Sequence, residues 1–127
     1  MGQGKYIGVL SSGGDAPGMN AAIRAVVRTG IYHGNTMFGI NRGYQGMIEG
    51  DIEQVDRYFV SNIIKDGGTI LQTARSSEFL TKEGREKAFK SLKRFGIDSI
   101  IVIGGDGSFR GLHQLLQEHP IQGIGVP

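Results

Sequence analysis

The fold is decided by the stretch Ile97-Asp98-Ser99-Ile100-Ile101-Val102-Ile103-Gly104-Gly105-Asp106-Gly107-Ser108. Its four consecutive apolar residues, 100–103, predict a strand buried on both faces, as a central strand of a parallel sheet is. The glycine turn that follows opens a helix, whose apolar residues recur at three- and four-residue steps from Phe109 to Leu116 before Pro120 closes it. The stretch therefore predicts a parallel strand, a glycine turn and a helix in direct succession.

Outward from this stretch, strands and helices continue to alternate. We expect strands at residues 5–10, 36–40 and 121–126, and helices from Pro17 to Gly34 and from an N-cap at Thr81 to Gly96. A loop is expected through Tyr44, and residues 48–75 indicate only a short helix near 60–64 and a turn at 66–68. This order predicts an α/β fold, a doubly wound and mainly parallel sheet with helices on both faces.

The composition is that of one globular domain, residues 1–127. Hydrophobic residues make up 39% and charged residues 20%, which does not favour disorder. No apolar run approaches the roughly 18 residues of a membrane span. A net charge of +2 with dispersed basic residues predicts no nucleic-acid partner. The absence of Cys, disulfides and a signal peptide leads us to expect a cytoplasmic location.

The turn Gly104-Gly105-Asp106-Gly107-Ser108 carries the chemistry that we expect of this domain. A helix that starts after a glycine turn presents free backbone N–H groups and the positive end of its dipole, which favour a phosphate. A carboxylate in such a turn would repel phosphate unless a cation lay between them, so Asp106 is a candidate Mg²⁺ ligand. The alternative, equally open on spacing alone, is that Asp106 caps the helix.

A second glycine turn, Ser11-Ser12-Gly13-Gly14-Asp15, follows the first strand in the same way. It matches neither the dinucleotide-binding nor the P-loop fingerprint, but two such turns at one sheet edge favour a nucleotide triphosphate site with Mg²⁺. Arg75 is a candidate for a bidentate phosphate contact, and Arg24 and Arg28 lie one helical turn apart. From the residues alone, a solvated helix face is favoured over a second anion site for that pair.

Three motifs in order closely resemble those of the bacterial ATP-dependent 6-phosphofructokinase family. They are Ile7-Gly8-Val9-Leu10-Ser11-Ser12-Gly13-Gly14-Asp15-Ala16-Pro17-Gly18-Met19-Asn20-Ala21-Ala22-Ile23-Arg24, then Gly67-Gly68-Thr69 through Thr73-Ala74-Arg75, and Ile103-Gly104-Gly105-Asp106-Gly107-Ser108. The resemblance implies transfer of the ATP γ-phosphoryl group to the 1-hydroxyl of fructose 6-phosphate, in a cytoplasmic homotetramer. It also implies Asp106 on Mg²⁺ and ATP contacts at Gly14, Tyr44, Arg75, Ser76, Gly105, Asp106, Gly107 and Ser108. Pyrophosphate-using relatives carry Asp at the position of Gly107, so this glycine favours ATP.

The resemblance further implies an allosteric site for an effector such as ADP between subunits, at Arg24, Arg28, Arg57 and Tyr58. It therefore reverses the preference for a solvated face at Arg24 and Arg28. Two positions depart from the family pattern: Asn62 stands where an acidic effector-site residue often occurs, and Leu80 where an Arg often assists ATP.

In the family, the segment with the catalytic base, the sugar-phosphate arginines and a second domain follow the position of Pro127. We therefore expect these residues to be a fragment that is inactive alone. Two alternatives remain at this point: a nucleotide-binding regulatory module without catalysis, and a fragment of a NAD-kinase or diacylglycerol-kinase type phosphotransferase.

Overall fold

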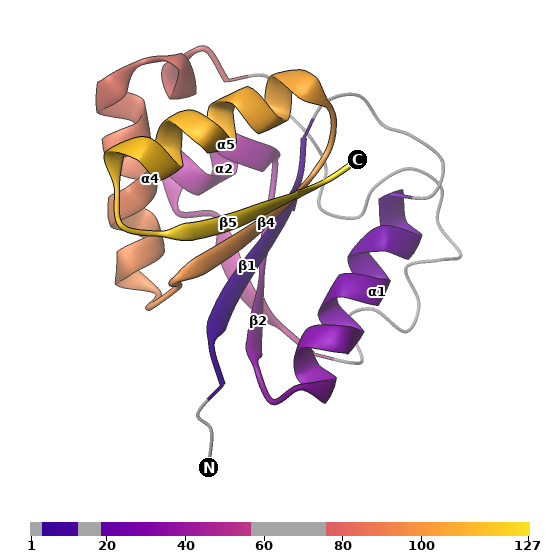
Figure 1. Cartoon of the computed structure of the whole chain (residues 1–127). Coiled ribbons are helices and arrows are strands. Elements are labelled where there is room, and N and C mark those ends of the chain that lie inside the picture. The colour runs from indigo at the N-terminus through magenta and orange to yellow at the C-terminus, as the bar shows by residue number, and fades with distance from the viewer. Residues whose placement is uncertain (1–3, 13–18, 57–75) are drawn as a thin grey trace.

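The computed structural model describes residues 4–12, 19–56 and 76–127, which form one sheet and the helices that pack on it (Figure 1). The elements are β1 (Tyr6–Ser11), α1 (Met19–Tyr32), β2 (Thr36–Ile40), α2 (Gly43–Glu49), β3 (Ile52–Val55), η2 (Glu78–Leu80), α4 (Lys82–Arg94), β4 (Ser99–Ile103), α5 (Asp106–Glu118) and β5 (Gln122–Val126). The five strands are arranged in the order β3-β2-β1-β4-β5.

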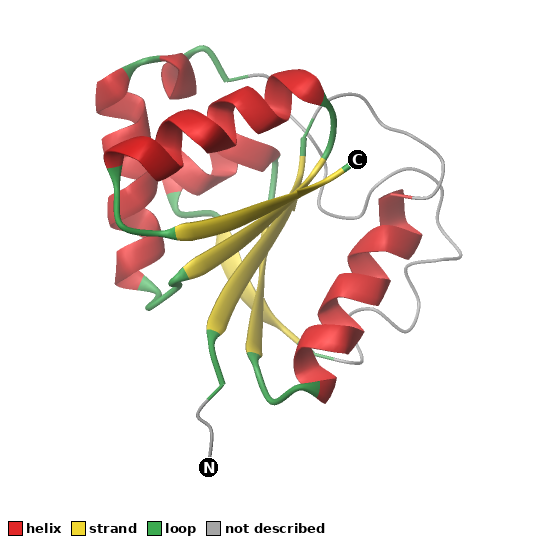
Figure 2. Ribbon diagram, viewed as in Figure 1, coloured by secondary structure: helices red, strands yellow, loops and turns green. Residues whose placement is uncertain are grey.

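The sheet is mainly parallel, as predicted. Strands β1, β2, β4 and β5 pair in parallel, and only β3 pairs antiparallel, with β2. Helix α1 covers one face, whereas α2, α4 and α5 lie on the other (Figure 2). The predicted fold class, a doubly wound α/β sheet with helices on both faces, is therefore confirmed.

The structure corrects the sequence prediction between β2 and α4. The predicted loop through Tyr44 is the short helix α2, and the edge strand β3 and the 3-10 turn η2 were not predicted. Helix α2 begins after Arg42, whose left-handed backbone (φ 59°) turns the chain out of β2. The short helix and turn expected within residues 57–75 lie outside the described residues.

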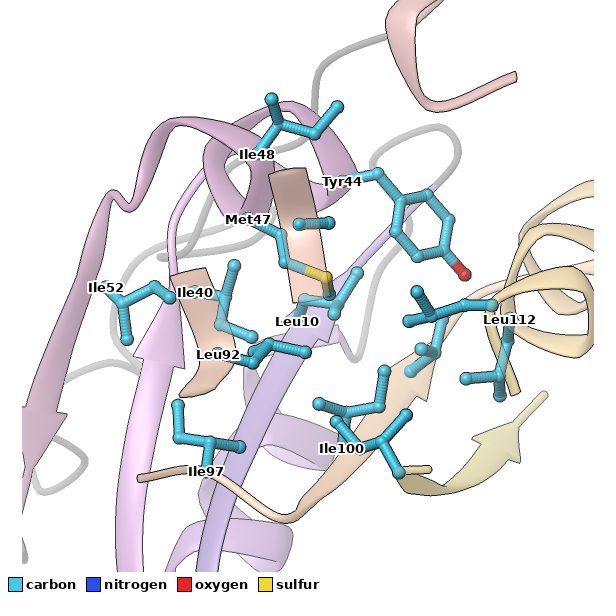
Figure 3. Close-up of a cluster of buried hydrophobic side chains, with 14 of the residues drawn as sticks. Leu10, Ile40, Tyr44, Met47, Ile48, Ile52, Leu92, Ile97, Ile100 and Leu112 are labelled. Carbon is cyan, nitrogen blue, oxygen red and sulfur yellow. The ribbon is translucent and has the colours of Figure 1, made fainter. Parts of the chain in front are cut away.

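Each face of the sheet has its own hydrophobic core, because successive strand residues point to opposite sides. Leu10 belongs to the larger cluster, under α2, α4 and α5, where it packs with residues such as Met47 and Leu92 (Figure 3). Its neighbour Val9 belongs to the smaller cluster under α1, with Ile23 and Val27. Strand β4 also contributes apolar residues to both clusters, as its apolar run predicted.

Capping residues set the bounds of the helices. The hydroxyl oxygen of Thr81 accepts a hydrogen bond from the Gly84 backbone N–H at 3.0 Å, which confirms Thr81 as the N-cap of α4. Gly34 and Gly96 follow α1 and α4 with φ of 82° and 75°, the left-handed conformation that glycine adopts at helix ends. The positions of these residues in the sequence therefore predicted the helix ends.

A largely buried ion pair links α4 to α5. The Arg85 guanidinium donates two hydrogen bonds to the Glu118 carboxylate, at 2.7 and 2.9 Å, and a third to the Phe79 carbonyl oxygen at 3.1 Å. One side chain thus links α4, the end of α5 and η2.

In the part of the chain that the structure describes, no helix combines the length and hydrophobicity that crossing a bilayer requires.

Candidate phosphate-binding site

The two predicted glycine turns begin side by side at one edge of the sheet. Ser11 and Ile103 are register partners at the ends of β1 and β4, and the Ser12 backbone N–H donates to the Ile103 carbonyl at 2.9 Å. Both strands therefore end at the same edge (Figure 1). The rest of the first turn, including Gly14 and Asp15, lies outside the described residues.

Asp106 is the first residue of α5, and the cap position before it is held by Gly105. The interpretation of Asp106 as the helix cap is therefore wrong. Its carboxylate is exposed, and it takes part in none of the ion pairs among the described residues. Among the described residues no cation pairs with this carboxylate at the positive end of a 13-residue helix, which suits a residue that meets a ligand.

The three glycines of this turn differ in whether their surroundings leave room for a side chain. A Cβ on Gly104 would lie 2.6 Å from the Ser12 carbonyl oxygen and 2.7 Å from the Ser108 hydroxyl, so the fold itself requires glycine there. A Cβ on Gly105 or Gly107 would meet no described atom within 4 Å, and neither residue has a positive φ. At these two positions packing against the described residues does not require glycine, and those residues leave space at the helix start.

Tyr44 supports the turn from beneath. Its side chain is 7% exposed, its ring stacks on Phe79 with centroids 4.0 Å apart, and its hydroxyl donates to the Ser108 carbonyl oxygen. Figure 3 shows this hydroxyl directed toward Leu112 of α5. Burial raises the pKa of Tyr44, so the hydroxyl keeps the proton that it donates. The predicted ATP contact Tyr44 thus also anchors the first turn of α5.

Ser76, a predicted ATP contact, lies just before η2 and is held by α2 and η2. Its hydroxyl donates to Gln45 Oε1 at 2.7 Å and accepts from the Phe79 backbone N–H at 3.1 Å. Sequence reasoning missed Gln45 and Phe79, because neither belongs to a glycine motif and α2 was taken for a loop. Tyr44 and Phe79 are far apart in the sequence, so no periodic pattern indicates that their rings stack.

The donor groups fit a Mg²⁺ ion held jointly with phosphate. Among the described residues there is no cluster of three or more His, Asp or Glu that would hold a metal by itself. Asp106 is a single exposed carboxylate, and Mg²⁺ commonly takes one or two carboxylates and completes its shell with phosphate oxygens and water. A hollow of about 590 Å³ lies beside it along α5, lined by Asp106, Phe109, Arg110, His113 and Gln114.

The predicted effector residues are only partly within the described structure. Arg24 and Arg28 lie on α1, and Arg24 Nε is buried with no hydrogen-bond partner among the described residues. Arg57, Tyr58 and Asn62, like the predicted ATP contact Arg75, fall outside those residues. Leu80, at the end of η2, is 77% exposed.

The fold and this site define a class of protein: a doubly wound α/β domain with a glycine turn, the candidate phosphate site, between an inner strand and the start of a helix. The sequence model of the family described as Phosphofructokinase matches residues 6–127. The chain belongs to the phosphofructokinase family. This assignment leaves no place for the interpretation as a NAD-kinase or diacylglycerol-kinase segment.

Individual relatives agree with this assignment. The ATP-dependent 6-phosphofructokinase of Halothermothrix orenii is 62% identical over 123 residues, which are 97% of this chain and 37% of the relative. That of Clostridium botulinum is also 62% identical, over 97% of this chain and 38% of its own length. The chain therefore spans less than two fifths of the length of these curated relatives.

Solved structures show the same arrangement of elements. The phosphofructokinase of Saccharomyces cerevisiae superposes with a TM-score of 0.86 at 38% identity, covering 95% of this chain and 19% of that one. A pyrophosphate-dependent phosphofructokinase from Marinobacter aquaeolei gives a TM-score of 0.82 at 19% identity, over 97% of this chain and 33% of that one. The second likeness shows the fold alone.

Proposed function

We propose that this chain is the N-terminal ATP- and Mg²⁺-binding part of a 6-phosphofructokinase, which transfers the γ-phosphoryl group of ATP to the 1-hydroxyl of fructose 6-phosphate. The enzyme would act in glycolysis, as a cytoplasmic homotetramer. Membership of the phosphofructokinase family and the activity of relatives at 62% identity, which are ATP-dependent 6-phosphofructokinases, support the proposal.

The observation that carries the proposal is the turn at residues 104–108. Around Gly105 and Gly107 the described residues leave space at the start of α5, where the helix presents its N–H groups. Asp106 lies between these glycines with an exposed carboxylate. The N–H groups would hold the phosphates, and Asp106 would hold Mg²⁺, which neutralises phosphate charge during transfer. The other proposed ATP contacts are Gly14, Tyr44, Arg75, Ser76 and Ser108. Arg75 is the proposed contact to the transferred phosphate.

Calorimetry with Mg²⁺ and ATP tests this site directly. We expect Asp106→Asn to abolish the Mg²⁺ dependence of ATP binding while the melting temperature stays close to that of the wild type, because the carboxylate has no ion-pair partner among the described residues. In the full-length enzyme, the same Asp106→Asn substitution should lower kcat with fructose 6-phosphate by about a hundredfold or more. Unchanged Mg²⁺-dependent ATP binding would refute the assignment.

A second anion site, for an allosteric effector such as ADP, is favoured by one observation on α1. Arg24 Nε is buried without a hydrogen-bond partner among the described residues. A buried unpaired donor costs about 1–3 kcal/mol, and this cost would be relieved if the guanidinium turned toward a bound phosphate. Together with Arg28, and with Arg57 and Tyr58, we assign Arg24 to that effector site. The competing function, a regulatory nucleotide-binding module without catalysis, would use this site alone.

A further inference from the structure

We propose that Gln45 is a positioning residue of the donor site, which holds Ser76 at a fixed place relative to the first turn of α5. The inference rests on the proposed function, because Ser76 and Ser108 are two of the proposed ATP contacts. The hydrogen bonds of the Gln45 side chain among the described residues go to Ser76, Glu49 and Glu78, and none goes to the glycine turn. Gln45 acts through Ser76, to which it is joined by a hydrogen bond of 2.7 Å.

The orientation of the Gln45 amide is set by its acidic neighbours. Its Nε2 donates to Glu49 at 2.9 Å and to Glu78 at 3.4 Å. Hydrogen bonds from Arg42 and then Gln45 lower the pKa of Glu49, and those from Lys87 and then Gln45 lower the pKa of Glu78. Both carboxyl groups are therefore ionised at neutral pH and only accept hydrogen bonds. The amide nitrogen must face them, so Oε1 must face Ser76.

This orientation commits the Ser76 hydroxyl proton. A serine hydroxyl has one proton and two acceptor lone pairs. The proton goes to Gln45 Oε1, and one lone pair accepts from the Phe79 N–H. The other lone pair has no hydrogen-bond donor among the described residues. The Ser76 side chain can therefore accept from a nucleotide hydroxyl or amino group, but it has no proton to donate to a phosphate oxygen while Gln45 is in place.

The residue before Gln45 fixes the same helix to the other side of the site. The Tyr44 hydroxyl donates to the Ser108 carbonyl. The Tyr44 ring stacks on Phe79, a residue of η2 whose backbone N–H donates to the Ser76 hydroxyl. A Cβ on Gly111 of α5 would come within 3.1 Å of Phe79 and 3.3 Å of Tyr44, so α5 packs closely on this pair. Two consecutive residues of α2 thus tie Ser76 and the first turn of α5 to one rigid element.

The test is a double-mutant cycle on Mg²⁺-dependent ATP binding, measured by calorimetry far below the melting temperature. Gln45→Leu and Ser76→Ala should each weaken binding by about three- to tenfold, the equivalent of one hydrogen bond. The double variant should bind no more weakly than the weaker single variant, because both remove the same link. The matched control is Gln117→Leu, at an exposed position of α5, which should bind as the wild type does.

A purely structural role for Gln45 predicts a different result: a lower melting temperature with unchanged ATP affinity. That result, or additive losses in the cycle, would overturn the proposal. If Gln45→Leu does not fold, the same cycle is run with Gln45→Glu, whose second oxygen would face Glu49 and Glu78 and disturb the same link. If Asp106→Asn also leaves Mg²⁺-dependent binding intact, the donor site itself is wrong. If only the Gln45 and Ser76 variants bind normally, the positioning role alone fails.

Discussion

The carbonyl oxygen of Ser12 lies where a side chain on residue 104 would have to begin, 2.6 Å from the Cβ position of Gly104. The same Ser12 donates its N–H to the Ile103 carbonyl at 2.9 Å. The chain that leaves β1 therefore runs directly against the chain that leaves β4. This contact fixes the start of the first glycine turn beside the second, at the edge where we place the phosphates.

Alanine substitutions at Gly104 and Gly105 should separate the needs of the fold from those of the ligand. We expect Gly104→Ala to destabilise the protein by about 1–3 kcal/mol, because its methyl group would overlap the Ser12 carbonyl. Gly105→Ala should cost no more than about 1 kcal/mol, because its backbone is extended and its surroundings are open among the described residues, so that the loss is that of a glycine N-cap. It should nevertheless weaken ATP binding. Thermal melts and calorimetry on both variants check this. Equal loss of stability in the two would contradict it.

An acidic residue at position 107 should discriminate against ATP. Gly107→Asp would place a second carboxylate beside Asp106 at the phosphate position, and we expect ATP affinity to fall more than tenfold, roughly the effect of 1.4 kcal/mol or more. The fold should tolerate the change because a Cβ meets no described atom within 4 Å. Gly107→Asn is the control of equal size, and it should lose less affinity. Equal losses for Asp and Asn would indicate that bulk, and not charge, excludes the nucleotide.

Much of the fold follows from local patterns in the sequence. The apolar run of β4 predicted a doubly buried central strand, and Thr81, Gly34 and Gly96 predicted helix ends, because burial and capping depend on residues close together in the chain. Helix α2 was not predictable in this way. It has seven residues and contains Gly43 and Gly46, so its stability comes from packing on the sheet and on α4 rather than from helix propensity.

The residues of the candidate site also differ in whether local sequence patterns point to them. Asp106 and its glycines could be proposed as a site because a glycine turn between a strand and a helix is a local feature with a chemical meaning. Gln45 and Phe79 escaped because their roles arise from contacts across 31 and 35 residues of chain, with Ser76 and Tyr44. Nor could spacing decide whether Asp106 caps α5. The structure decides it by placing Gly105 at the cap position.

The effector proposal makes a prediction for α1. Arg24→Ala should weaken ADP binding at the effector site by about tenfold, the scale of a charge-assisted contact to phosphate, while the Mg²⁺-dependent ATP site stays intact. Calorimetry with ADP and with Mg²⁺ and ATP separates the two sites. Lys90→Ala, which removes an exposed cation from α4, is the control and should affect neither. Unchanged ADP affinity in Arg24→Ala would leave only the Asp106 site for nucleotides.

The ion pair between Arg85 and Glu118 should make stability depend on pH in a defined direction. The hydrogen bonds from Arg85 lower the pKa of Glu118 below its usual value of 4.5, against the opposing effect of burial. A carboxyl group whose folded pKa is lowered stabilises the fold above its unfolded pKa. The contribution of Glu118 is therefore complete above about pH 4.5 and is lost as the pH falls through the lower folded value.

Arg85→Leu should accordingly lower the melting temperature by several degrees at neutral pH, because it leaves Glu118 without its partner and frees the Phe79 carbonyl. The difference from the wild type should narrow as the pH falls below about 4.5, where the wild-type carboxylate becomes protonated as well. Replacing both partners by Leu should recover part of the loss. Lys90→Leu is the control, since its pair with Glu86 spans 3.8 Å on the exposed face of α4 and should contribute little. A difference between Arg85→Leu and the wild type that stays constant across this pH range would show that Arg85 stabilises the fold by packing and its bond to Phe79, without its charge.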